Sequence, residues 1–366
     1  MNFDFSDEQK EFRAGVRRYL AEKCPLTVTR RVLDGPETHA AEIWQGLADL
    51  GCLGAAIPEV YGGAGLGALE VCVVAEEIGR ACAPVPFSSS VYLATEALLR
   101  FGNEAQKKAW LPRLASGEVI GTLAVAEGTD APVEGKLKST FTGGTLVGTK
   151  LPVADGEAAH IAIVLAGHTL ALVELAGNGV KRERIETIDP ARKYARITFA
   201  SAKAETLGTS GDGWRQLSEL YDAAAVYMAF EQTGGTEAAM WMARDYALER
   251  YAFGRPIGSQ QAIKHKLADM YIKLELSRSN AYYGAMMLSG RGADLPVAAA
   301  AARVAANDAY IFAAQENVQT HGGIGFTWAA DPQFHYRRAR LLAHALGVPA
   351  LWKERLVSAL ERRNVA

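Results

Sequence analysis

From about Gly211 onward the chain has the periodicity of long helices separated by glycine and proline. Helices are predicted near residues 214–251, 259–289 and 296–320, followed by one from about 332 and a short closing helix. Helices of this length with apolar faces bury those faces against one another. This part of the sequence therefore predicts a four-helix bundle.

The remaining sequence divides into two blocks of different character. Residues 1–117 again show helical spacing, with capping boxes predicted at Ser6 with Gln9 and at Asn103 with Gln106. Residues 118–207 carry short β-rich runs, with hairpin turns predicted at 142–145 and near Gly167. We predict a mainly α, α+β chain. It has an N-terminal helical domain (1–117), an antiparallel β-barrel-like domain (118–207) and a C-terminal four-helix bundle (208–366).

Composition excludes several classes of protein. The 366 residues are 49% apolar and carry 39 basic against 41 acidic side chains, a net charge of −2. This balance argues against a disordered chain and against nucleic-acid binding. No apolar run reaches the roughly 20 residues of a membrane span. The N-terminal residues are polar and acidic, unlike a signal peptide, so we expect a cytoplasmic protein whose four cysteines are free thiols.

The sequence contains no recognisable dinucleotide-binding loop and no metal-binding motif. The glycine-rich run at 62–67 lies in a helical block and in no βαβ unit, so it predicts a turn and not a dinucleotide loop. The seven histidines lack metal-ligand spacing, and no metal site is predicted. Composition and periodicity alone therefore define a fold class without a function.

Five short motifs together are more specific. They are PEVYGG at 58–63, AEEIGR at 75–80, FGNEAQK at 101–107, YALERYAFGRPI at 246–257 and QTHGGIGF at 319–326. In order and spacing they resemble the acyl-CoA dehydrogenase family, and the resemblance covers nearly the whole chain. Within that family, the chain resembles the smaller subunit of heteromeric, steroid-type members.

The resemblance implies an FAD-dependent oxidoreductase of fatty acid or steroid catabolism. In such enzymes a carboxylate removes the α proton of an acyl-CoA thioester while hydride leaves the β carbon for the flavin. Hydrogen bonds to the thioester carbonyl stabilise the enolate that develops. The family passes its electrons to an electron-transfer flavoprotein and forms oligomers.

The resemblance also assigns cofactor-binding residues that reach across to a partner subunit's FAD. These residues are Arg250, Phe253, Gln261, Gln319, Gly322 and Gly323. Arginine suits the pyrophosphate because its guanidinium can make paired hydrogen bonds to phosphate oxygens. Glycines allow backbone N–H groups to approach the cofactor closely.

The half of the flavin site that a subunit forms for its own cofactor departs from the family pattern. Ala126 stands where the family has a threonine that bonds the flavin ring. Pro152 and Ala154 stand where an aromatic residue and a threonine make the second ring contact. Side-chain donors are therefore missing, while backbone contacts to a ring remain available.

Both positions that hold the catalytic base in this family lack a carboxylate. One branch of the family carries its glutamate at the position of Leu346, and the other carries it at Ala224. Ala225 also replaces an arginine that commonly contacts CoA, whereas Asp222 matches a CoA-contacting residue. Asp222 is thus a candidate substrate-binding residue, and the catalytic residue is unassigned.

Glu231 offers one alternative base. It lies seven residues after Ala224 on the same predicted helical face, about 10 Å along the helix. Burial could raise the pKa of such a carboxyl into the range that a base needs. The competing interpretation, which we favour, is a glutamate paired within the bundle.

Three hypotheses follow. In the first, the chain is the base-lacking subunit of an acyl-CoA dehydrogenase that introduces a 2,3 double bond, and a homologous partner supplies the glutamate in an α2β2 assembly. In the second, it is a self-sufficient homo-oligomeric acyl-CoA dehydrogenase with an unusual base. In the third, it is a non-catalytic member used for assembly or acyl binding.

Overall fold

The computed structural model describes residues 5–365, which form two compact units, each made of separated stretches of chain. One unit takes residues up to Thr29, Ala68–Ala83 and everything from Ala225 onward. The other takes Arg30–Gly67 and Pro84–Ala224. The three-domain division at residues 117 and 207 stays a prediction.

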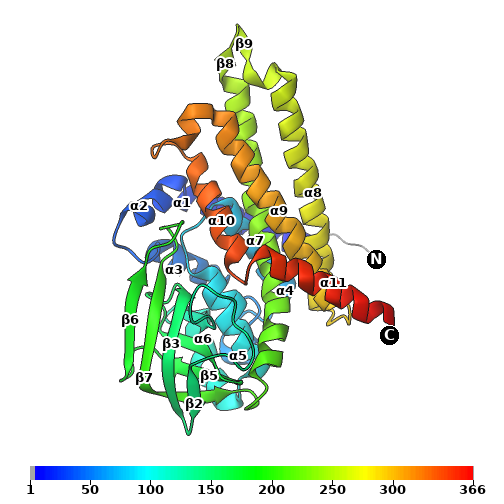
Figure 1. The fold of residues 1–366 in the computed structure, drawn as a ribbon. Helices are drawn as coiled ribbons and strands as arrows, with labels where there is room; N and C mark the ends of the chain where they lie inside the picture. Colours follow the sequence, from blue (N-terminus) through cyan, green and yellow to red (C-terminus); the bar gives the residue numbers. More distant parts are fainter. Residues whose placement is uncertain (1–4, 366) are drawn as a thin grey trace. The chain divides into compact units, whose positions relative to one another are not determined.

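The first unit is a bundle of helices (Figure 1). Its helices are α1 (Asp7–Lys23), α4 (Ala68–Arg80), α7 (Gly213–Glu249, from Ala225 on), α8 (Gln261–Ser289), α9 (Leu295–His321), α10 (Pro332–His344) and α11 (Pro349–Val365). The predicted long helices are confirmed. The closing helix, predicted to be short, extends over 17 residues. The capping box at Ser6 is also confirmed, with Gln9 N bonded to Ser6 Oγ at 3.2 Å.

Small side chains set the spacing of these helices. A buried cluster draws Ala239 and Ala243 from α7, Met270 and Leu274 from α8, and Ala313 from α9. Alanine favours the helix and loses no side-chain entropy when it is buried. Alanine-rich faces therefore bring the helix backbones close together, and a few long methionine and leucine side chains fill the remaining space.

Helices α4 and α7 touch through two glycines. A Cβ added to Gly79 would lie 1.7 Å from the carbonyl oxygen of Glu231, and one added to Gly234 would lie 1.8 Å from the carbonyl oxygen of Glu76. Side chains of any kind are excluded at such separations. The two backbones are thus in direct contact, and each helix supplies one of the glycines.

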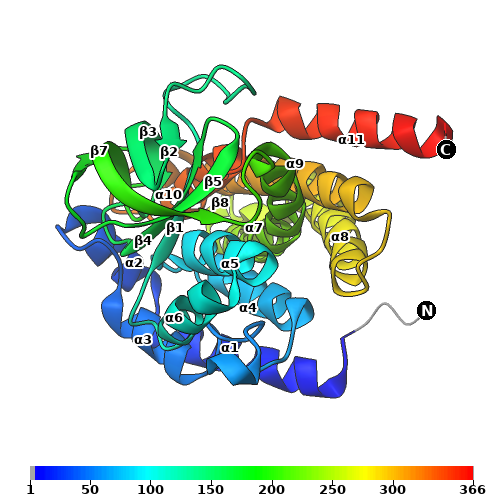
Figure 2. The same ribbon diagram turned by 90° about the horizontal axis from the view of Figure 1, so that it is seen from below.

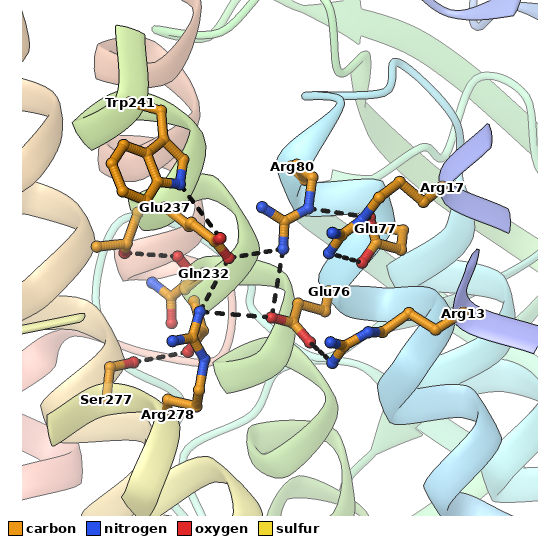
Figure 3. A network of polar contacts seen from close by, with 12 residues as sticks. Arg13, Arg17, Glu76, Glu77, Arg80, Gln232, Glu237, Trp241, Ser277 and Arg278 are labelled. Carbon is orange, nitrogen blue, oxygen red and sulfur yellow. Dashed lines mark hydrogen bonds and ion pairs between the residues drawn. The ribbon is translucent and has the colours of Figure 1, made fainter. Parts of the chain in front are cut away.

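A network of ion pairs to largely buried carboxylates surrounds this contact (Figure 3). Arg80 on α4 bonds Glu237 on α7 at 2.7 Å and Glu77 at 2.9 Å. From α8, Arg278 reaches Glu237 at 2.9 Å. From α1, Arg17 makes a bidentate pair with Glu77 at 2.8 and 2.9 Å. Four helices are therefore joined through carboxylates that are largely removed from water.

Burial and charge compete at these carboxyls. Burial would raise the pKa of Glu237, but the hydrogen bond and charge of Arg80 hold it below its ordinary value. At Glu76, burial is the stronger effect and raises the pKa despite Arg80 and Arg13. Arg80 contacts Glu76, Glu77 and Glu237, so its removal would take a partner from three carboxylates at once; breaking a single buried pair already costs about 3–5 kcal/mol.

The second unit contains a seven-stranded mixed sheet (Figure 2). Its strands are β1 (Gly121–Ala124), β2 (Thr140–Thr142), β3 (Thr145–Ala154), β4 (Ile161–Ala166), β5 (Thr169–Glu174), β6 (Val180–Ile185) and β7 (Tyr194–Leu207). The order is β1-β4-β5-β7-β3-β2, with β6 also paired to β7. Both predicted hairpins, β2–β3 and β4–β5, are confirmed.

The predicted barrel-like form of the β domain is wrong, because the sheet is open and does not close into a barrel. Its strand pairs are mostly antiparallel, as predicted, but β1 pairs with β4 in parallel, Gly121 opposite Ile161. A parallel pair joins strands that are distant in sequence, so local turn signals could not indicate it.

Helices pack against the sheet edge at β1. The unit's helices are α2 (Leu26–Asp34, from Arg30 on), α3 (Ala41–Asp49), η1 (Glu59–Tyr61), the π-helix η2 (Ser88–Thr95), α5 (Glu96–Phe101), α6 (Glu104–Ala115) and the first part of α7, up to Ala224. A Cβ on Gly121 would meet Ala94 of η2 at 2.4 Å and Leu114 of α6 at 3.6 Å. The absence of a side chain at Gly121 thus lets β1 lie directly on η2. The predicted cap of α6 at Asn103 is confirmed.

Within residues 5–365, no helix combines the length and apolarity needed to cross a membrane. Over the same residues, no group of three or more His, Cys, Asp and Glu side chains is placed to hold a metal ion.

The α4–α7 contact can be tested by adding one methyl group. Gly79→Ala should lower the free energy of unfolding by about 3 kcal/mol or more, because the new Cβ clashes with backbone that cannot swing away. Gly15→Ala is the matched control: it lies in α1 with nothing within 4 Å of an added Cβ, and it should stabilise by about 1 kcal/mol. Urea denaturation measures both, and equal effects would contradict the contact.

Candidate cofactor and substrate sites

A hairpin follows the end of α7 and carries the first predicted cofactor residues. Strands β8 (Tyr251–Ala252) and β9 (Arg255–Pro256) are joined by Phe253 and Gly254, both with positive φ, at +54° and +76°. Two positive φ values are the signature of a type I′ turn, which favours Asn-Gly. An aromatic residue in that conformation is strained, and its side chain is 98% exposed. The fold thus holds Phe253 outward.

The second predicted segment lies at the end of α9. Gly322 has φ +64° and ψ −140°, a conformation that is essentially restricted to glycine, and a Cβ there or at Gly323 would meet nothing within 4 Å. Gln319 is exposed one turn earlier, and Gln261 is exposed at the start of α8. Exposed backbone in open space is the arrangement that a nucleotide cofactor can approach.

A ring contact brings these segments together. Tyr246, in the last turn of α7, stacks on His321 at the end of α9, with ring centroids 4.0 Å apart and planes at 24°. Arg250 lies one turn beyond Tyr246, and Gly322 follows His321 directly. The structure therefore places the Arg250 hairpin and the Gly322 turn at the same end of the bundle. Sequence reasoning missed both rings, although each lies inside a motif that it used.

The predicted ring-binding positions lie on the sheet of the second unit, and their backbone is already engaged. Ala126 O accepts a hydrogen bond from Leu151 N at 3.0 Å, and Ala154 O accepts one from Thr122 Oγ1 at 2.6 Å. Pro152 carries no N–H. The side-chain donors are therefore missing, and the carbonyl oxygens of Ala126 and Ala154 each accept a hydrogen bond within the unit.

Glu127 ties together the ends of the loop that follows. Its carboxylate accepts hydrogen bonds from Lys138 N at 2.7 Å and Ser139 N at 2.9 Å, from the Ser139 hydroxyl, and from Lys150 Nζ at 2.9 Å. Burial would raise the pKa of Glu127, but the donors from Ser139, Lys138 and Lys150 lower it to about 2. Lys150 is fully buried, so this carboxylate is its counter-charge.

The predicted substrate and base positions lie on α7 and after α10. Asp222 is 7% exposed, and Ala224 and Ala225 are fully buried on α7. Leu346, after α10, is 1% exposed and apolar. The structure therefore contains no carboxylate at either base position.

Glu231 lies inside the first unit. It is fully buried, and its backbone carbonyl packs on Gly79. The buried Arg303 is close enough for its pKa to respond to Glu231: burial lowers the pKa of Arg303 to about 9, and the charge of Glu231 acts in the opposite direction. Arg303 also bonds Gln232 and the carbonyl of Leu342. The full burial of Glu231 argues against a base that substrate can reach.

Comparison with known proteins agrees with this architecture. Residues 6–118 match the model of the acyl-CoA dehydrogenase N-terminal domain, and residues 211–356 match that of the C-terminal domain. An acyl-CoA dehydrogenase of Bacillus subtilis is 30% identical over 344 residues, which are 88% of this chain and 89% of that one. The chain belongs to the acyl-CoA dehydrogenase family of oxidoreductases.

Two similar solved structures bear names of paired proteins. The ChsE4-ChsE5 complex from Mycobacterium tuberculosis contains a chain 27% identical, with a TM-score of 0.87, and the match covers 99% of each chain. The Tcur3481-Tcur3483 steroid ACAD contains one 28% identical, with a TM-score of 0.89, covering 98% of this chain and 99% of that chain.

The family implies FAD, and the two halves of its site differ in how they fit it. The open Gly322 turn and the exposed Arg250 hairpin leave room for a nucleotide cofactor to approach. The positions around Ala126 and Ala154 offer a flavin ring no side-chain donors, and each of their carbonyl oxygens already accepts one hydrogen bond.

The positive φ of Gly322, at the end of α9, predicts different effects of alanine at Gly322 and at Gly323. Gly322→Ala should cost about 1–3 kcal/mol of stability through backbone strain alone, since an added Cβ has room. Gly323→Ala also has room and lacks the positive φ, so it should leave stability within about 0.5 kcal/mol of wild type. Thermal unfolding compares the two, and an unperturbed Gly322→Ala would refute the strained turn.

The Glu127 clamp predicts a pH dependence. Its pKa is about 2 in the folded protein against an ordinary 4.5, so its stabilisation is complete above about pH 4.5 and is lost as the pH falls towards 2. Glu127→Gln should therefore cost about 3 kcal/mol at pH 7 and progressively less below pH 4.5. Denaturant titrations at several pH values measure this. The exposed Glu134→Gln is the control, expected to change stability by less than about 0.5 kcal/mol at any pH.

Proposed function

We propose that this chain is the subunit without a catalytic base in a heteromeric acyl-CoA dehydrogenase, which introduces a 2,3 double bond into an acyl-CoA thioester. The observation that carries the proposal is the side chains at the two base positions of the family. Ala224 and Leu346 are buried and apolar, so neither can accept the α proton. A homologous partner chain supplies the glutamate.

The retained residues support the same division of labour. Arg250, Phe253 and the Gly322 turn stay exposed at one end of the bundle, where a second subunit can be reached. Arg250 would pair with the pyrophosphate of an FAD seated in the partner, and the backbone of Gly322 and Gly323 would approach the same cofactor. When bound, FAD supplies the acceptor for the hydride that leaves the β carbon.

The names of the similar structures support pairing with a homologue. A named complex of two proteins, and a steroid acyl-CoA dehydrogenase with a double name, both match this chain over nearly its full length. By analogy, the assembly is an α2β2 heterotetramer, and a bulky steroid side-chain thioester is the substrate class to test first. Asp222, 7% exposed on α7, is the residue of this chain proposed to contact CoA. An electron-transfer flavoprotein is the proposed acceptor.

Purification alone and with a partner tests the proposal. We expect the chain produced alone to contain little flavin and to show no acyl-CoA dehydrogenase activity. Co-produced with a homologous acyl-CoA dehydrogenase chain from the same genome, it should yield a yellow, active complex. In that complex Arg250→Gln should weaken FAD retention by about tenfold or more, because a phosphate partner is lost. The exposed Arg362→Gln is the matched control.

A contrary result would be equally informative. A yellow and active protein from this chain alone would contradict the heteromer proposal and would make Glu231 a candidate base again. Glu231→Gln would then decide: loss of turnover in a folded, flavin-loaded protein assigns the base to Glu231, and unchanged turnover removes it.

A further inference from the structure

The stack of Tyr246 on His321 has a fixed geometry. The Nδ1 of His321 lies 2.9 Å from the carbonyl oxygen of Asn317, one turn earlier on α9. A carbonyl only accepts hydrogen bonds, so Nδ1 carries the proton and the imidazole plane is set by the helix. Stacking at 4.0 Å between ring centroids then holds the side chain of Tyr246 against the imidazole.

Each ring is joined by short backbone links to one of the cofactor segments. Tyr246 O accepts the hydrogen bond of Arg250 N at 2.8 Å, and Arg250 O accepts that of Ile257 N at 2.7 Å, which closes the hairpin. On the other side, Gly322 follows His321, and its N–H bonds Gln319 O. The backbone of each ring-bearing residue is therefore directly connected to a segment that the proposed function assigns to the cofactor.

Further contacts hold the preceding turns of these helices. Lys266 on α8 pairs with Glu316 on α9 at 2.5 Å, and Asn317 Nδ2 lies 3.2 Å from Met242 Sδ on α7. Tyr246 and His321 each lie four residues nearer the helix ends than Met242 and Asn317. Helix ends fray unless they are held, and the ring stack sits at the point where these two ends would separate.

We infer that the Tyr246–His321 stack is a positioning element. It fixes the separation between the Arg250 hairpin and the Gly322 turn so that both contact one nucleotide cofactor of the partner subunit. Neither ring is assigned to touch the cofactor. The inference rests on the proposed function, because it takes the two segments to share a ligand.

Substitution of the rings tests the inference in the co-produced complex. His321→Leu and Tyr246→Leu remove the stack, His321→Phe keeps an aromatic ring without the hydrogen bond, and His344→Leu changes an exposed histidine elsewhere as the control. The readouts are the FAD dissociation constant and the visible absorption spectrum of bound flavin, with thermal unfolding to confirm that each variant is folded.

We expect His321→Leu and Tyr246→Leu each to weaken FAD binding by about tenfold, and the double variant to be no weaker than either single one. His321→Phe and His344→Leu should bind within twofold of wild type. Equal FAD affinity in His321→Leu and wild type would overturn the inference while leaving the proposed function intact, as would a loss in His321→Phe equal to that in His321→Leu. A wild-type complex that binds no FAD would overturn both.

Discussion

Direct backbone contact between α4 and α7 is the constraint on which the helical unit depends. At Gly79 and Gly234 the facing atoms are carbonyl oxygens, so the interhelical distance is set by backbone alone. At that distance Arg80 on α4 can reach Glu237 on α7 directly, and helices α1 and α8 add their arginines to the same carboxylates. Close packing excludes water, which strengthens these charge pairs and raises the penalty for breaking any one of them.

The two units differ in how they present the residues that the family uses to bind its cofactor. In the second unit, polar atoms near the ring-binding positions are turned inward: Glu127 neutralises Lys150, and the carbonyls of Ala126 and Ala154 are bonded. In the first unit, the hairpin and the Gly322 turn project polar and aromatic groups outward. This difference between the two units is consistent with the proposed function, which rests on the apolar side chains of Ala224 and Leu346 at the two base positions.

Local signals in the sequence predicted the helices, the caps at Ser6 and Asn103, and both hairpins, because each depends on residues a few positions apart. The parallel β1–β4 pair and the open sheet could not be predicted in this way, since they join strands separated by long connections. The candidate site divides similarly. Motifs located the Arg250 and Gly322 segments, but the contact of Tyr246 with His321 spans 75 positions and depends on how α7 and α9 pack.

The strained Phe253 is one of several exposed apolar side chains at this end of the bundle. Two further apolar side chains nearby are more than half exposed: Leu248 lies in the last turn of α7, and Tyr251 lies in the same hairpin as Phe253. Exposed apolar side chains favour contact with other apolar surfaces, including those of chaperones and proteases. Under the proposed function a partner would bury these groups, and a copy without that partner would keep them exposed.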